Sequence, residues 1–98
     1  MSAGRQDGTV KAVQVRVTGR VQGVSFRWYT QEQARLLGVV GWVRNEPDGS
    51  VLLHAEGEDE AVDALVAWCH EGPGFARVQQ VAVREAAPGG ATSFEVTY

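Results

Sequence analysis

Residues 13–37 change from a strand pattern to a helix pattern across a glycine-bracketed loop, and this order strongly constrains the fold. Valines first alternate with polar residues, at Val13, Val15 and Val17. The loop then reads Gly-Arg-Val-Gln-Gly-Val-Ser-Phe-Arg over residues 19–27. Helical spacing follows, at Phe26, Thr30, Ala34 and Leu37. A period of two predicts a strand with one buried face, and a period near 3.6 predicts an amphipathic helix.

A loop of this kind can bind an anion. Glycine reaches positive φ without steric cost, so successive backbone N–H groups can point into one concavity. The N-terminus of the following helix adds unsatisfied N–H groups and partial positive charge. Arg27 lies in the first helical turn, where its planar guanidinium can meet two oxygens of a phosphoryl group. The same pattern also fits a simple turn followed by a surface arginine, so both interpretations stay open.

Turn residues divide the rest of the chain into short elements. We expect strands over residues 39–45, 51–56 and 77–85, a helix over 58–71 and a closing strand over 94–98. In the strand over 77–85, Val78 is out of phase with Val81 and Val83, which predicts a bulge or an irregular start. Residues 1–9 are small and polar and predict a flexible tail, and residues 10–98 predict one domain.

The expected order is strand, helix, strand, strand, helix, strand, with a last strand appended. Two helices of this size can cover only one face of a four- to five-stranded antiparallel sheet. The sequence therefore predicts an α+β, ferredoxin-like split βαβ (βαββαβ) sandwich. This layout serves many functions, so the fold by itself selects none of them.

Several function classes fit the sequence poorly. No apolar run approaches the ~20 residues that span a bilayer, and residues 1–9 do not resemble a signal peptide, so we expect a cytoplasmic protein. Cys69 is the only cysteine and is expected to be buried, which argues against disulfides and cysteine metal sites. The strand over 51–56 has no aromatic residue or arginine, which argues against nucleic-acid binding. His54 is expected to be solvated.

Charge is distributed unevenly along the chain. Residues 1–50 contain seven lysines and arginines and four acidic residues, whereas residues 51–98 contain two and eight. The positive half holds the glycine-bracketed loop, which favours an anion as its ligand. Glu46 and Asp48 belong to the Glu-Pro-Asp-Gly turn and have the wrong spacing for a magnesium site. We therefore expect a phosphate site that needs no metal.

Two motifs closely resemble those of the acylphosphatase family. The first is carried by Gly19, Val21, Gln22, Gly23, Val24, Phe26 and Arg27. The second is carried by Gly41, Trp42, Val43, Arg44, Asn45, Gly49, Val51 and Gly57. Both motifs follow the family's order and spacing, and no position that the family uses for chemistry departs from it. The resemblance implies a ferredoxin-like fold, in agreement with the element order.

The resemblance also implies an activity: hydrolysis of the carboxyl–phosphate anhydride of an acyl phosphate to a carboxylate and inorganic phosphate. It assigns phosphoryl binding to Arg27 and positioning of the attacking water to Asn45. The expected phosphate-binding loop comprises Arg20, Val21, Gln22, Gly23, Val24, Ser25 and Phe26. We expect no cofactor, inorganic phosphate or sulfate as a ligand, and a monomer.

Two alternatives remain open from the sequence. Asn45 precedes Glu-Pro-Asp-Gly and could cap the hairpin instead of holding water. The chain could also be a non-catalytic acylphosphatase-like module that binds phosphate or a partner. Larger carbamoyl-transfer enzymes of hydrogenase maturation begin with such a domain.

Overall fold

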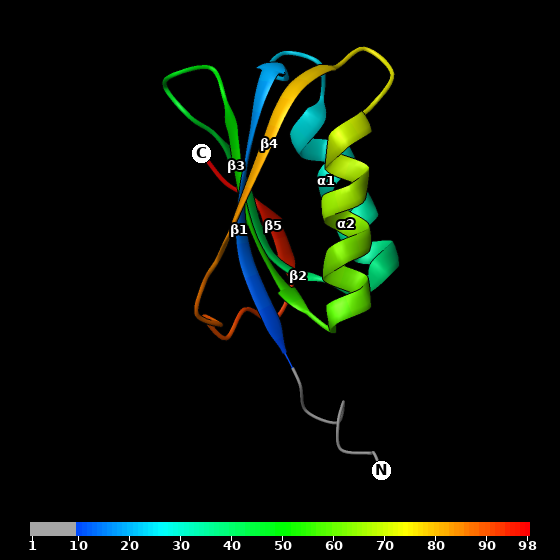
Figure 1. Ribbon diagram of the computed structural model, residues 1–98, viewed down its shortest axis with the longest axis vertical. Coiled ribbons are helices and arrows are strands. Elements are labelled where there is room, and N and C mark those ends of the chain that lie inside the picture. The colour runs from blue at the N-terminus through cyan, green and yellow to red at the C-terminus, as the bar shows by residue number, and fades with distance from the viewer. Residues whose placement is uncertain (1–9) are drawn as a thin grey trace.

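The computed structural model describes residues 10–98, and it places both helices against the same face of one sheet (Figure 1). The elements are β1 (Lys11–Arg20), α1 (Phe26–Leu37), β2 (Val40–Asn45), β3 (Val51–Gly57), α2 (Asp59–Glu71), β4 (Arg77–Glu85) and β5 (Phe94–Val96). This order confirms the ferredoxin-like α+β prediction. The expected tail, residues 1–9, lies outside the described residues.

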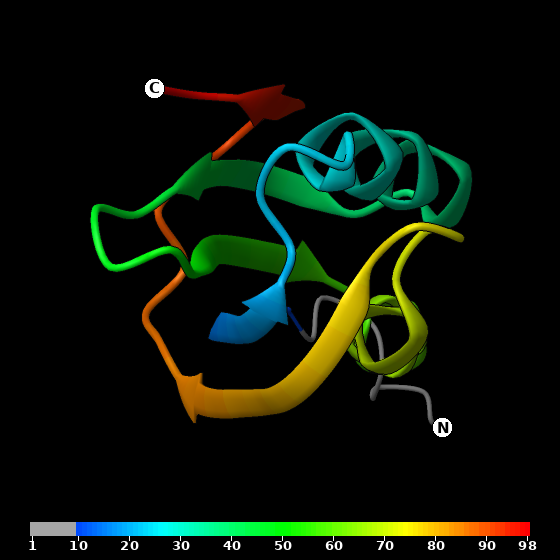
Figure 2. The same ribbon diagram turned by 90° about the horizontal axis from the view of Figure 1, so that it is seen from above.

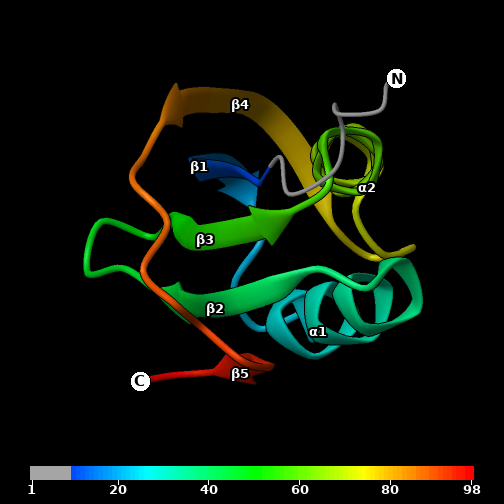
Figure 3. The ribbon, with the colours of Figure 1, turned by 90° about the horizontal axis from the view of Figure 1, so that it is seen from below.

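The sheet has five strands in the order β4-β1-β3-β2-β5. Strand β1 pairs antiparallel with both β3 and β4, and β2 pairs antiparallel with β3. Strand β5 departs from the expected antiparallel sheet, because it pairs parallel with β2. The cause is the connection over residues 86–93, which crosses to the far edge of the sheet so that β5 runs in the direction of β2 (Figure 3).

The core lies between the sheet and the two helices, which Figure 2 shows end-on, both on one side of the sheet. Val13, Val15 and Val17 point into it, as their alternation predicts. Its largest fully buried side chains are Phe26, Phe94, Leu53 and Leu65. Cys69 also lies there, and burial raises the pKa of its thiol to about 12, so it acts as a small apolar side chain.

A bulge occurs where β1 and β4 reach the loop over residues 21–25. Thr18 pairs with Gln80 but Gly19 pairs with Val78, so Gln79 is the extra residue. The bulge confirms the prediction made from β4 and brings Val78 back into phase with Val81. It also requires a glycine in β1, because a Cβ on Gly19 would lie 2.2 Å from the carbonyl oxygen of Arg77.

The prediction that His54 is solvated is wrong. Its side chain lies on the sheet face opposite the helices, yet the residue is only 7% exposed. The ring stacks on Trp42 with centroids 5.9 Å apart, and Nε2 lies 2.7 Å from Oε2 of Glu56. The same carboxylate accepts a hydrogen bond of 2.6 Å from the amide of Gly89 in the β4–β5 connection. The burial of His54 comes from the ring of Trp42 and from this connection. Neither contact is evident from the local alternation of the strand.

Candidate active site

The loop between β1 and α1 has the backbone geometry of an anion cradle. Gly23 has φ 76°, as its predicted role requires, and Ser25 has φ 62°. Ser25 is the only non-glycine residue with positive φ among residues 10–98. Left-handed residues interspersed with ordinary ones turn neighbouring N–H groups toward one side. A strained residue that precedes a helix is also typical of functional loops.

The first turn of α1 adds donors to this cradle. Ser25 is the N-cap residue, and its side chain forms no capping hydrogen bond. The helical bonding begins with the amide of Tyr29, which donates to the carbonyl of Ser25 at 3.1 Å. The N–H groups of Phe26 to Trp28 therefore have no acceptor within the helix. These groups and the positive end of the helix dipole suit an anionic ligand.

Gln22 fastens the loop to the β2–β3 hairpin. Its side-chain amide donates 2.8 Å hydrogen bonds to the carbonyl oxygens of Glu46 and Ser50. The side chain of Gln22 therefore pins the loop and does not face solvent. Because Glu46 follows Asn45 directly, this contact holds the end of β2 beside the loop.

The C-terminal residues orient Arg27. Its guanidinium donates to the carbonyl oxygen of Thr97 at 3.3 Å and lies 4.8 Å from the ring centroid of Tyr98. The amide of Thr97 in turn donates to the carbonyl of Val43 in β2 at 2.8 Å. Both partners of Arg27 are neutral, and it forms no ion pair within residues 10–98. Its charge is thus held in place without being neutralised.

Asn45 is the last residue of β2 and pairs with Val51. Strand alternation places its side chain on the side of Val43, which is the helix side of the sheet. That side chain makes no hydrogen bond to any residue in the described range 10–98. The hairpin is capped by Asp48 instead, whose Oδ1 accepts from the amide of Ser50 at 2.9 Å. The amide of Asn45 therefore remains available for a ligand or water.

The carboxylates of the hairpin are engaged with other partners. Glu46 accepts a 2.7 Å bond from Nε of Arg44. Hydrogen bonds from the hydroxyl and then the amide of Ser50, with Arg16 nearby, lower the pKa of Asp48. Over residues 10–98, no group of three or more His, Cys, Asp or Glu side chains is arranged to hold a metal ion. In that same range no helix is long and apolar enough to cross a membrane.

The parts converge at one end of the sheet. Thr97 links Arg27 to β2, and Gln22 links the loop to the residue after Asn45. The sequence did not indicate the contacts of Thr97 and Tyr98, because nothing in the alternation of the last strand shows that it borders the loop. The left-handed conformation of Ser25 was not predicted either, because serine offers no local signal for it.

Comparisons with known proteins agree on one family. A sequence model of the acylphosphatase family matches residues 13–96. An acylphosphatase of Nocardioides sp. is 58% identical over 91 residues, which cover 92% of each chain. One from Rubrobacter xylanophilus is 59% identical over 97 residues, covering 98% of this chain and 86% of the relative.

Solved structures agree as well. The structure of an acylphosphatase from Coxiella burnetii superposes with a TM-score of 0.90 and 34% identity, covering 96% of this chain and 99% of that one. Its fold therefore matches over nearly the whole of both chains. The family model, the relatives and this superposition lead to one conclusion: the chain belongs to the acylphosphatase family, a family of hydrolases.

Proposed function

We propose that this chain hydrolyses acyl phosphates to a carboxylate and inorganic phosphate, with Arg27 binding the phosphoryl group and Asn45 positioning the attacking water. One observation carries the proposal: an anion cradle, an unneutralised guanidinium and an amide without a protein partner meet at one end of the sheet. The family membership supports the same reaction.

The phosphoryl group is held by backbone N–H groups of residues 20–26 and by Arg27. Phosphoryl transfer depends mostly on positioning and on stabilising charge, and these groups supply both. Thr97 and Tyr98 limit the positions that the guanidinium can occupy, so its two-point contact is set before the substrate binds.

Asn45 acts on the water. Its carbonyl can accept a hydrogen bond from the water while its NH₂ group donates to a phosphoryl oxygen. The amide does not titrate near neutrality, so it orients the water without removing its proton. That proton passes to a phosphoryl oxygen of the substrate. The leaving carboxylate needs no proton, because its conjugate acid is far stronger than water.

The positive charge that this mechanism needs comes from Arg27 and the N-terminus of α1, so no step requires a metal ion. We propose a monomer that acts on a small acyl phosphate and also binds inorganic phosphate or sulfate. The cytoplasm suits such a chain, since its single cysteine is a free thiol.

The test is the initial rate of benzoyl phosphate hydrolysis, measured with a chelator and again with added magnesium. We expect turnover that is equal in both, and competitive inhibition by inorganic phosphate. A rate that disappears in chelator and returns with a divalent ion would contradict the metal-free mechanism. Phosphate binding without turnover would instead support the alternative of a non-catalytic module.

A further inference from the structure

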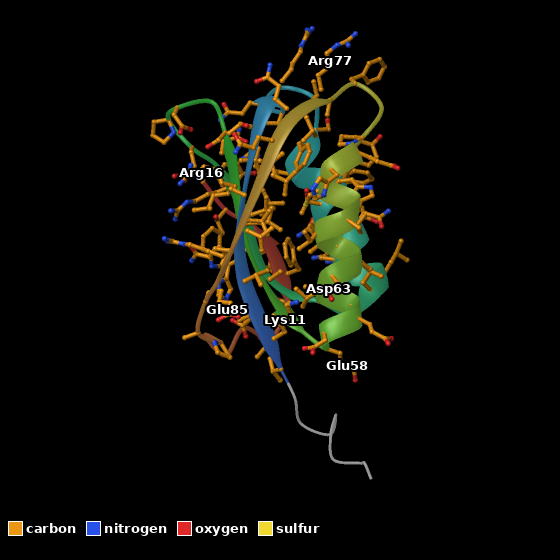
Figure 4. The ribbon with its side chains drawn as sticks, viewed as in Figure 1. Lys11, Arg16, Glu58, Asp63, Arg77 and Glu85 are labelled. Carbon is orange, nitrogen blue, oxygen red and sulfur yellow. The ribbon has the colours of Figure 1, made fainter. Side chains whose placement is uncertain are left out.

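A cavity adjoins the proposed phosphate loop. It has a volume of about 350 Å³ and is lined by Arg20, Val24, Gly74, Phe75, Ala76 and Arg77. Arg20 is the last residue of β1 and Val24 belongs to the loop, whereas the other four belong to the segment that leads from α2 into β4. Figure 4 shows Arg77 at this end of the molecule, with its side chain directed outward.

Two arginines in this cavity face each other without a counterion. Arg20 and Arg77 are direct partners in the β1–β4 pairing. Like charges at opposed positions destabilise a strand pair. Neither arginine forms an ion pair or a side-chain hydrogen bond within residues 10–98, whereas Arg16, Arg44 and Arg84 do. An anion bound between the two guanidinium groups would offset their repulsion.

The cavity also has an apolar wall. Phe75 is 85% exposed, although a phenylalanine ring usually gains free energy by burial. The half-buried Val24 and Ala76 extend this surface toward the core. An exposed ring beside two cations suits a ligand with a short apolar stem and an anionic end.

We propose that this cavity binds the acyl part of the substrate and selects acyl phosphates that carry a second negative charge at the end of a short carbon chain. The inference rests on the proposed hydrolase function. Val24 lines the cavity and also belongs to the proposed phosphate-binding loop, three residues before Arg27. A substrate whose phosphoryl group is held by that loop therefore has its acyl group beside the cavity.

Arg20 and Arg77 act in this proposal as specificity-determining residues, because they touch the far end of the substrate and not the reacting atoms. Their guanidinium groups hold the second anion through charge-assisted hydrogen bonds. Phe75 contacts the carbons between that anion and the acyl carbonyl. A neutral acyl chain of equal length keeps the apolar contact and loses the ionic one.

The test compares succinyl phosphate with butyryl phosphate, which differ only in whether the chain ends in a carboxylate or a methyl group. We expect the wild type to have the higher kcat/KM for succinyl phosphate. Arg77→Gln should reduce kcat/KM for succinyl phosphate about fivefold, the scale of one exposed ion pair, and leave that for butyryl phosphate unchanged. Arg77→Lys keeps the charge and should retain most of the preference. The preference should also fall as salt is added.

Arg84→Gln is the matched control, because it removes the same charge from the same strand and lies outside this cavity, bonded to Gln14. It should leave the preference unchanged, and melting curves should show that every variant is folded at the temperature of the assay. Equal wild-type rates on the two substrates would overturn this inference while leaving the proposed function intact. So would an equal loss of preference in both glutamine variants. Hydrolysis of neither these two substrates nor benzoyl phosphate would overturn both proposals.

Discussion

Charged groups have partners at one end of the sheet and lack acidic partners at the other. At the lower end in Figure 4, Lys11 and Asp63 lie together at 2.6 Å. Glu56, which pairs with Ala12 next to Lys11, is bonded to both His54 and Gly89. At the end that carries Arg77, the cations Arg20, Arg27 and Arg77 have no acidic partner in the range 10–98. Paired charges stabilise the fold, whereas the ligand site that we propose lies where charges and an amide are held in place without a counterion.

The carboxylates nearest the phosphate loop sharpen this contrast. Glu46 lies beside the loop but is bonded to Arg44, and Asp48 is occupied by Ser50. Neither one neutralises Arg27. The hairpin thus keeps its own charges balanced and leaves the adjacent cradle positive.

Removing Arg27 should have the largest effect, because it deletes the charge that binds the phosphoryl group in the proposed mechanism. We expect Arg27→Ala to lower turnover of benzoyl phosphate by at least ~10²–10³-fold, the scale of one lost transition-state donor. Arg27→Lys should restore little, since lysine lacks the planar two-point contact. Arg35→Ala, an exposed arginine in the last turn of the same helix, is the control and should keep full activity. Near-wild-type rates in Arg27→Lys would argue against two-point recognition.

Asn45→Ala should lower turnover by about 10²-fold and leave phosphate inhibition close to wild type, because the amide acts on the water in the transition state. Stability should change by less than about 0.5 kcal/mol, since the side chain has no protein partner that alanine would orphan. Asn45→Asp should be as inactive as alanine, because it adds a negative charge near the phosphoryl oxygens.

Asp48→Ala should have the opposite effect to Asn45→Ala, with stability lowered and activity retained. It removes the hairpin cap at Ser50, so melting curves should show a less stable protein that retains its activity. An Asn45→Ala variant that is active but destabilised by about 1 kcal/mol would show that Asn45 serves the hairpin and not the water.

Local sequence patterns predicted the elements because each depends on neighbours along the chain. The alternation of Val13 to Val17 fixed a buried strand face, and Gly38 ended α1 in the left-handed conformation, with φ 77°. The out-of-phase Val78 correctly indicated the bulge in β4. The positive φ of Gly23 follows from the same kind of local rule.

Contacts between distant segments were harder to predict. The partners of Arg27 depend on β5 running parallel to β2, which the connection over residues 86–93 decides. The burial of His54 depends on that same connection and on Trp42. The opposition of Arg20 and Arg77 requires the register that follows the extra residue Gln79. A one-residue shift in register would separate the two arginines.

Alanine substitutions at two glycines near the loop should separate effects on stability from effects on turnover. Gly19→Ala places a Cβ 2.2 Å from the carbonyl oxygen of Arg77 at φ 123°, so we expect a loss of about 3 kcal/mol in the free energy of unfolding. Gly23→Ala meets nothing within 4 Å at φ 76°, so it should cost only about 1 kcal/mol. Its turnover should still fall, because the strain shifts the cradle amides. Urea unfolding and initial rates measure both, and equal stability losses would contradict the close contact at Gly19.

The smallest effect is expected from Glu56→Gln, at the end of the sheet where the charged groups have partners. Burial raises the pKa of Glu56, but the hydrogen bonds from Gly89 and His54 outweigh it, so the pKa lies below the ordinary 4.5. A carboxyl group whose pKa is lowered by folding stabilises the protein fully above that ordinary value, and this contribution is lost as the pH falls through the lowered pKa. Glutamine keeps the shape without the charge, so the variant should lose about 1–2 kcal/mol near neutral pH, the scale of a hydrogen bond to a charged group.

This difference between wild type and Glu56→Gln should shrink as urea unfolding is repeated at pH values falling below 4.5. Turnover at neutral pH should be the same in both proteins, because Glu56 bonds only to His54 and to the β4–β5 connection. A stability difference that stays constant with pH would mean that packing, and not the ionised carboxylate, holds the connection. A loss of turnover would mean that the two ends of the sheet are coupled, and the division between paired and unpaired charge would then fail as a guide to the site.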